Sequence, residues 1–111
     1  MNEEYIEILA EIKERENSSP ERMLFLSVIF QALLDATKEK SKVESSRVSV
    51  ERANARAWFF CSVGVTCDNF EYICENAGMD AQYTRSFAIK VINSKEIKYV
   101  RQRIRKVLDK T

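Results

Sequence analysis

The chain has 111 residues, of which 45% are hydrophobic and 32% are charged, and its formal net charge is +1. This size suits one domain, and the balance of apolar and charged residues excludes an intrinsically disordered chain. Two glycines and one proline are too few for a sandwich or a barrel, and no apolar run is long enough to cross a membrane, so the composition favours an all-α protein.

The first half of the chain predicts a helical core. Apolar residues between positions 4 and 16 recur at three- and four-residue steps, which is typical of an amphipathic helix. Ser19 suits the N-cap and Pro20 the first position of a second helix that runs to about Lys38. That helix is apolar around nearly its whole circumference, so it belongs in the core, and residues 20–38 are also a reasonable surface for a homodimer.

A polar, serine-rich stretch over residues 39–49 predicts a surface loop. Ser49 is suited to cap a third helix, which we expect to end near Cys61 and to place Trp58 in the core. We therefore divide the single domain, residues 1–111, into N-terminal helices over 1–48 and a second half over 49–111.

The second half carries a pattern typical of a helix-turn-helix. Asp68 and Glu71 have the spacing of a capping box, which predicts a short helix from Asp68 to Ala77. Gly78 permits the positive φ of a sharp turn, and Asp80 is suited to cap another helix through about Ile92. Two short helices joined by a glycine-containing turn form the motif whose second helix enters the DNA major groove.

The outward face of that second helix supplies the candidate base-reading residues. Gln82 has the groups to pair with adenine and Arg85 those to pair with guanine, while Ser86 suits a base or a phosphate. Lys90 suits a phosphate. Thr84 stands where an aliphatic residue would normally pack inward, which leaves the pitch of the helix open.

The last predicted helix, from Lys95 to about Asp109, has one apolar stripe and is otherwise basic. Residues 81–111 hold nine Lys/Arg against two Asp/Glu, a balance of +7, whereas residues 1–80 hold nine against fifteen, a balance of −6. Lys95, Lys98 and Arg101 are therefore candidate phosphate contacts. Two alternatives stay open: an arginine-rich helix that binds RNA, and a solubilising surface that offsets the acidic half.

The segments Ala55–Phe60 and Phe70–Asp80, continued by Tyr83 and Arg85, resemble small phage and prophage proteins with an alanine-tryptophan helix followed by a helix-turn-helix-like segment. The likeness covers about residues 24–90. It implies a regulator from a phage or phage-derived gene cluster, without enzymatic activity and without a cofactor.

Several kinds of chemistry have no residues to support them. The chain has no histidine, and Cys61, Cys67 and Cys74 do not form a Cys-x-x-Cys pair, so neither a metal site nor a disulfide framework is expected. Neither a phosphate-binding glycine loop nor a serine elbow is present. The N-terminus lacks the positive flank of a signal peptide, and we expect a cytoplasmic protein that is not an enzyme.

These features predict a compact bundle of about five to six helices that contains a helix-turn-helix and is closed by a basic C-terminal helix. The leading hypothesis is a transcriptional regulator that binds double-stranded DNA. One alternative is a protein-interaction factor that acts on host RNA polymerase, as in antitermination. Another is a phage DNA-packaging component similar to a small terminase subunit.

Overall fold

Five helices make up the described part of the chain, residues 19–61 and 63–109, in this computed structural model. They are α2 (Pro20–Ala36), α3 (Ser46–Phe60), α4 (Val65–Ala77), α5 (Ala81–Ile92) and α6 (Ile97–Asp109). The all-helical prediction is confirmed, with no strand in these ranges. The helix expected over residues 4–16 lies outside the described residues. Within them, no helix has both the length and the apolar character needed to cross a bilayer.

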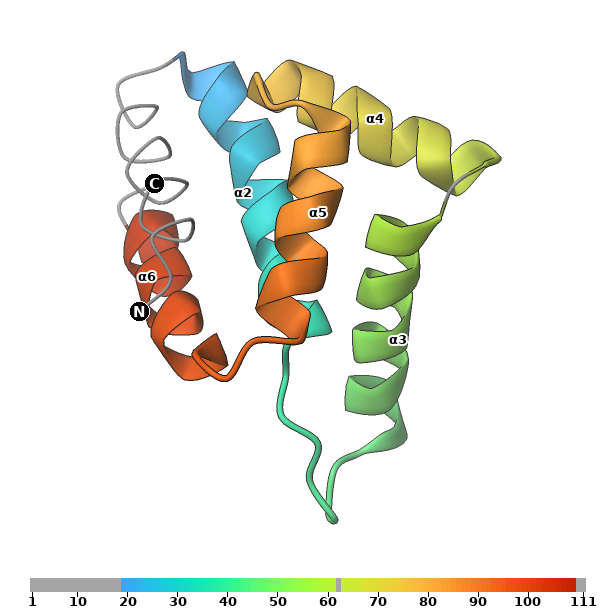
Figure 1. Cartoon of the computed structure of the whole chain (residues 1–111), viewed down its shortest axis with the longest axis vertical. Helices are drawn as coiled ribbons and strands as arrows, with labels where there is room; N and C mark the ends of the chain where they lie inside the picture. Colours follow the sequence, from blue (N-terminus) through green and yellow to red (C-terminus); the bar gives the residue numbers. More distant parts are fainter. Residues whose placement is uncertain (1–18, 62, 110–111) are drawn as a thin grey trace.

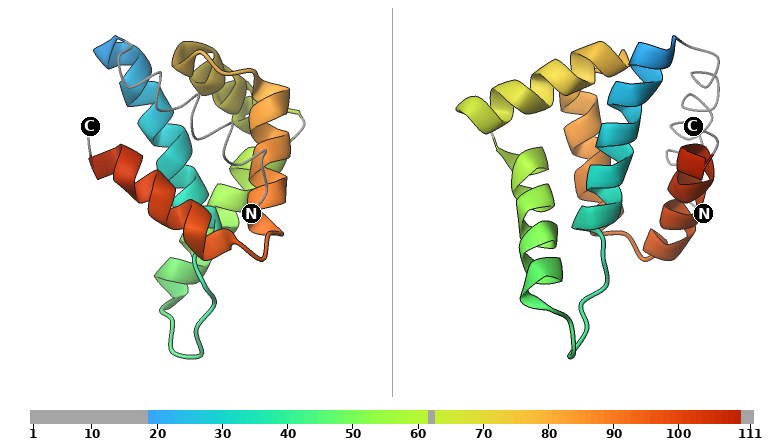
Figure 2. Two further views of the ribbon diagram at one scale, coloured as in Figure 1. Left: turned by 60° about the vertical axis from the view of Figure 1, so that its left-hand side comes forward. Right: turned by 180° about the vertical axis from the view of Figure 1, so that it is seen from behind.

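The helices run in alternating directions around α2. As Figure 1 shows, α2 and α5 run one way, α3 and α6 run the other way, and α4 crosses at one end. The C-terminal ends of α2 and α5 therefore lie at the same end of the molecule as the first turns of α3 and α6 (Figure 2). The carbonyl end of α2 is thus close to the first turns of α6, a segment that comes much later in the sequence.

The central helix α2 provides the middle of the core. Leu26, Ile29, Phe30 and Leu33 are at most 1% exposed, which explains why this helix is apolar on more than one face. Its largely exposed apolar side chains are Leu24 and Val28, at 64% and 42%. One chain by itself thus buries most of the apolar surface of α2, and a homodimer through residues 20–38 stays a prediction.

The other helices close this core with aromatic and branched side chains. Trp58 is only partly buried and packs edge-on against Phe59 and Phe70, with ring centroids 5.1 and 4.9 Å away. Its indole N–H donates to the Asn69 side chain at 2.9 Å. The buried side chains of α3 to α6 that complete the core are Ala55, Phe59, Phe70, Cys74, Ala77, Phe87, Ala88, Val91, Val100 and Ile104.

Several helix starts agree with the prediction. Ser19 caps α2 by accepting a hydrogen bond from the Arg22 amide at 3.3 Å, and Asp80 caps α5 by accepting one from the Tyr83 amide at 2.8 Å. The final helix begins at Ile97 rather than Lys95, with the Ser94 hydroxyl accepting from the Glu96 amide. Short side chains that carry an oxygen therefore mark these boundaries well.

Two predicted starts are wrong by about one turn. The third helix is capped by Ser45 rather than Ser49, because the Ser45 hydroxyl accepts from the Val48 amide at 3.3 Å. The fourth begins at Val65 rather than Asp68, because Gly64, with φ 92°, already turns the chain and its carbonyl accepts from the Asp68 amide. Asp68 thus lies in the first turn, where its charge still suits the positive helix end.

The three thiols differ in accessibility. Cys67 and Cys74 are buried, whereas Cys61 is partly exposed. Burial raises the pKa of the Cys74 thiol from 9.0 to about 11, so the thiol is neutral at physiological pH. We expect a thiol-reactive disulfide reagent to modify Cys61 first and Cys74 only as fast as the chain unfolds.

The same shift predicts a loss of stability in alkali. Because the folded pKa of Cys74 lies above the unfolded value, its contribution to stability is complete below pH 9.0 and is lost as the pH rises toward about 11. Urea unfolding at about pH 8 and about pH 10.5 measures this loss. A Cys74→Ala variant with the same pH slope as the wild type would contradict the assignment.

Candidate nucleic-acid interface

The turn between α4 and α5 depends on Gly78. Gly78 has φ 74° and ψ 28°, the left-handed conformation that glycine adopts without a steric penalty. Its amide donates to the Glu75 carbonyl at 3.0 Å, and the Met79 amide donates to the Cys74 carbonyl at 2.9 Å. Asp80 then starts α5 at once, so α4 and α5 meet at a steep angle across a three-residue turn (Figure 1).

The inner face of α5 is set by four buried residues, Thr84, Phe87, Ala88 and Val91. Thr84, which departs from the usual pattern, is 0% exposed. Its hydroxyl donates to the Asp80 carbonyl at 2.8 Å. The polar atom is satisfied within its own helix, so threonine fills this inward position without leaving an unpaired hydroxyl in the core.

The outer face of α5 is a neutral stripe. Gln82, Ser86, Ile89 and Asn93 follow one another at steps of four, three and four residues, and all are exposed. This spacing places them along one line of the helix, opposite the buried face. Asn93, the C-cap residue, was missed by the sequence analysis, although its seven-residue distance from Ser86 was a sufficient signal. We call these four residues the outer stripe.

Arg85 does not belong to this stripe. Its Nε donates to the Phe59 carbonyl at 2.8 Å, and one terminal nitrogen donates to the Cys61 carbonyl at 3.0 Å. The guanidinium carbon lies 5.1 Å from the centre of the Phe70 ring. The last carbonyls of a helix carry partial negative charge, so Arg85 ties α5 to the end of α3. The guanidinium is thus directed toward α3 and not outward, as the predicted pairing with guanine would need.

Arg101 has a similar position at the end of α2. One terminal nitrogen donates to the Leu34 carbonyl and to the Thr37 hydroxyl, both at 2.6 Å. Burial, followed by the nearby Arg105, lowers the pKa of its guanidinium, which nevertheless stays protonated at neutral pH. Arg101 is therefore tied to the end of α2 through one terminal nitrogen, and its predicted phosphate contact stays a prediction.

The remaining candidates lie on the surface. Gln82, Ser86, Lys90, Lys95 and Lys98 are all exposed. Lys95 lies in the connection between α5 and α6, and Lys98 lies in the first turn of α6. Of the seven predicted DNA-binding residues, five thus face solvent along α5 and just beyond its C-terminal end.

The outer face of α6 is basic, as expected. Val100 and Ile104 are buried against the core, whereas Arg103, Arg105 and Lys106 are exposed. The Arg103 guanidinium lies 5.4 Å from the centre of the Tyr99 ring and bonds to the Tyr99 hydroxyl at 3.1 Å. Among the described residues, no carboxylate lies within ion-pair distance of these three cations.

The described residues contain no metal-binding cluster, and the comparisons with known proteins give no relative. Across residues 19–61 and 63–109, no three acidic or cysteine side chains gather in a way that would hold a metal ion. Comparisons of the chain with family models, with curated proteins and with solved structures find no match.

Proposed function

We propose that this protein binds double-stranded DNA through α5 and acts as a non-enzymatic regulator of transcription. The observation that carries the proposal is the outer stripe. The left-handed Gly78 turn and the buried face of α5 leave Gln82 and Ser86 exposed in the first half of the helix. This is the half that contacts base edges when such a helix enters the major groove.

The chemistry of the outer stripe suits base edges better than phosphates. The side-chain amides of Gln82 and Asn93 each have an oxygen that can accept a hydrogen bond from the adenine N6 amino group and a nitrogen that can donate one to adenine N7. Ile89 suits contact with the thymine methyl group. With Arg85 directed toward α3, the stripe contains no guanine-reading arginine. The proposed specificity is therefore for A·T pairs.

Phosphate contacts then come from one lysine of α5 and from two lysines beyond the end of the stripe. Lys95 and Lys98 are exposed where α5 passes into α6, and Lys90 lies on α5 itself. A helix seated in a groove has a phosphate strand on each side, so cations at its end fix the register without reading sequence. The resemblance of residues 24–90 to small phage and prophage proteins adds the proposal that this regulator belongs to a phage or phage-derived gene cluster.

Gln82→Ala and Lys95→Gln should weaken DNA binding in different ways. Loss of the amide should cost about 1–3 kcal/mol at a preferred site and reduce the preference for A·T. Loss of the lysine should weaken binding to all sequences and reduce the slope of log K against log salt by about 1. Gel-shift titrations of a randomised duplex pool at two salt concentrations, with sequencing of the bound fraction, measure both effects.

The chain offers matched controls for both changes. Gln102 is an exposed glutamine of α6, and Lys42 is an exposed lysine of the loop after α2. Gln102→Ala and Lys42→Gln should leave binding unchanged. If the Gln82 variant keeps the wild-type sequence preference, or if Lys42→Gln changes the salt slope as much as Lys95→Gln, the proposed role of α5 is wrong.

A further inference from the structure

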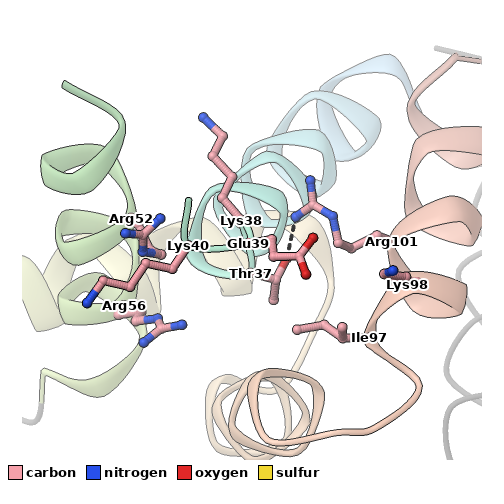
Figure 3. Close-up of a pocket in the computed structure, with 9 residues that line it drawn as sticks. All are labelled: Thr37, Lys38, Glu39, Lys40, Arg52, Arg56, Ile97, Lys98 and Arg101. Carbon is pink, nitrogen blue, oxygen red and sulfur yellow. Dashed lines mark hydrogen bonds between the residues drawn. The ribbon is translucent and has the colours of Figure 1, made fainter. Parts of the chain in front are cut away.

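A basic pocket of about 400 Å³ opens where α2 ends, between α3 and α6 (Figure 3). Lys40 and the two α3 arginines lie on one side of it, and Lys98 and Arg101 lie on the other. Six of its nine lining residues are cationic and one is acidic. The lining consists of Thr37, Lys38, Glu39, Lys40, Arg52, Arg56, Ile97, Lys98 and Arg101.

Two of the six cations are neutralised by carboxylates. Arg52 forms an ion pair with Glu44, and Lys38 lies 3.2 Å from Glu51 and 3.5 Å from Asp35. Because these carboxylates balance the charges of Arg52 and Lys38, the two cations need no bound anion.

The other four cations, Lys40, Arg56, Lys98 and Arg101, have no carboxylate within ion-pair distance in the described ranges. The partial negative charge at the end of α2 corresponds to only about half an elementary charge. Together with the single carboxylate of Glu39, it leaves the pocket with excess positive charge.

The two unpaired arginines are held in place by the backbone of α2. Arg56 Nε donates to the Ala36 carbonyl at 2.9 Å. Arg101 donates through one terminal nitrogen to the Leu34 carbonyl and the Thr37 hydroxyl. A guanidinium has five N–H donors, so each arginine keeps further donors for a ligand. Side chains fixed in advance lose less entropy on binding.

From this convergence of fixed guanidiniums and unpaired lysines we infer a binding site for a small phosphate-bearing anion. The paired N–H groups of a guanidinium match the spacing of phosphate oxygens, and lysine ammonium groups add positive charge without needing a fixed orientation. Four unpaired cations suit a ligand with more than one negative charge. The volume lies at the small end of the range for small-molecule sites. The pocket shares Lys98 with the proposed DNA contacts, but the outer stripe contributes no residue to it, so base reading by α5 and anion binding in the pocket can be tested separately.

Inorganic pyrophosphate is the probe, titrated by calorimetry at low salt into the whole chain. We expect saturable binding of one ion per chain. The double variant Lys40→Gln/Lys98→Gln, which changes two exposed residues, should bind at least about tenfold more weakly. Glu39→Gln should bind more tightly, because it removes the only acidic residue of the lining. Circular dichroism confirms that each variant folds.

The matched control is Lys42→Gln/Lys106→Gln, which removes one exposed lysine from the same loop and one from α6 but leaves the pocket intact. Its affinity should equal that of the wild type. An equal loss in this control, or no saturation at about millimolar pyrophosphate, would overturn the site. Displacement of pyrophosphate by a short DNA duplex from the Lys98→Gln variant, which lacks the residue shared with the proposed DNA contacts, would also overturn it, because the pocket would then be a contact for backbone phosphate. The gel-shift result for Gln82 is a separate measurement and does not change with any of these outcomes.

Discussion

Phe70→Ala should lower the free energy of unfolding by about 3–5 kcal/mol, the usual cost of replacing a buried phenylalanine with alanine. Phe70 is 0% exposed. Its ring packs edge-on against Trp58 and Phe59 and lies beneath the Arg85 guanidinium. The substitution would therefore remove the shared contact of α3, α4 and α5. Urea unfolding followed by circular dichroism gives the value directly.

Phe60 provides the matched control. It is also a phenylalanine, but its side chain is 43% exposed, so Phe60→Ala should change the free energy of unfolding far less than the core substitution. Equal losses in the two variants would contradict the packing described for Phe70. An intermediate loss for Phe70→Leu would show that the cost follows the volume removed.

Arg85→Ala should lower the free energy of unfolding by about 2–3 kcal/mol, because it leaves the carbonyls of Phe59 and Cys61 without the charged donor that they now share. Arg85→Lys should recover only part of this loss, since an ammonium group cannot reproduce the fork that reaches both carbonyls. Urea unfolding of the three proteins tests the order wild type, lysine variant, alanine variant.

Arg105 is the control for this series, since it is an exposed arginine of α6. Arg105→Ala should stay within about 0.5 kcal/mol of the wild type. An Arg85 variant that keeps full stability but loses discrimination at one G·C pair would contradict the structural role and restore the base-reading one.

The helices themselves could be predicted because each one depends on local signals. Ser19 before Pro20, Gly78 at the turn and Asp80 after it act on the neighbouring few residues, and the structure contains all three as expected. The starts at Ser45 and Gly64 were missed since several serines compete in one loop and the backbone of Gly64 acts without a side-chain signal. Local rules identify that a helix exists more reliably than where it begins.

The candidate site could be predicted only in part, for a reason that Arg85 illustrates. Periodicity places this residue near the outward face of α5, and it says nothing of a long side chain that bends back to another helix. The partners of Arg85 lie 24 and 26 residues away, and the Leu34 carbonyl lies 67 residues from Arg101. Such contacts depend on how the helices pack, so the exposure of Gln82 and Ser86 could be predicted from the sequence, whereas the backbone partners of the two arginines could not.

The bond from Arg101 to the end of α2 also has a consequence for biosynthesis. On the ribosome, α2 is translated well before residue 101, so the Leu34 carbonyl and the core surface covered by Val100 and Ile104 stay open to water until α6 has been synthesised. Docking of α6 is therefore expected to follow the packing of α2 to α5, and nascent chains stalled before α6 should be more susceptible to proteases and chaperones than chains stalled after it.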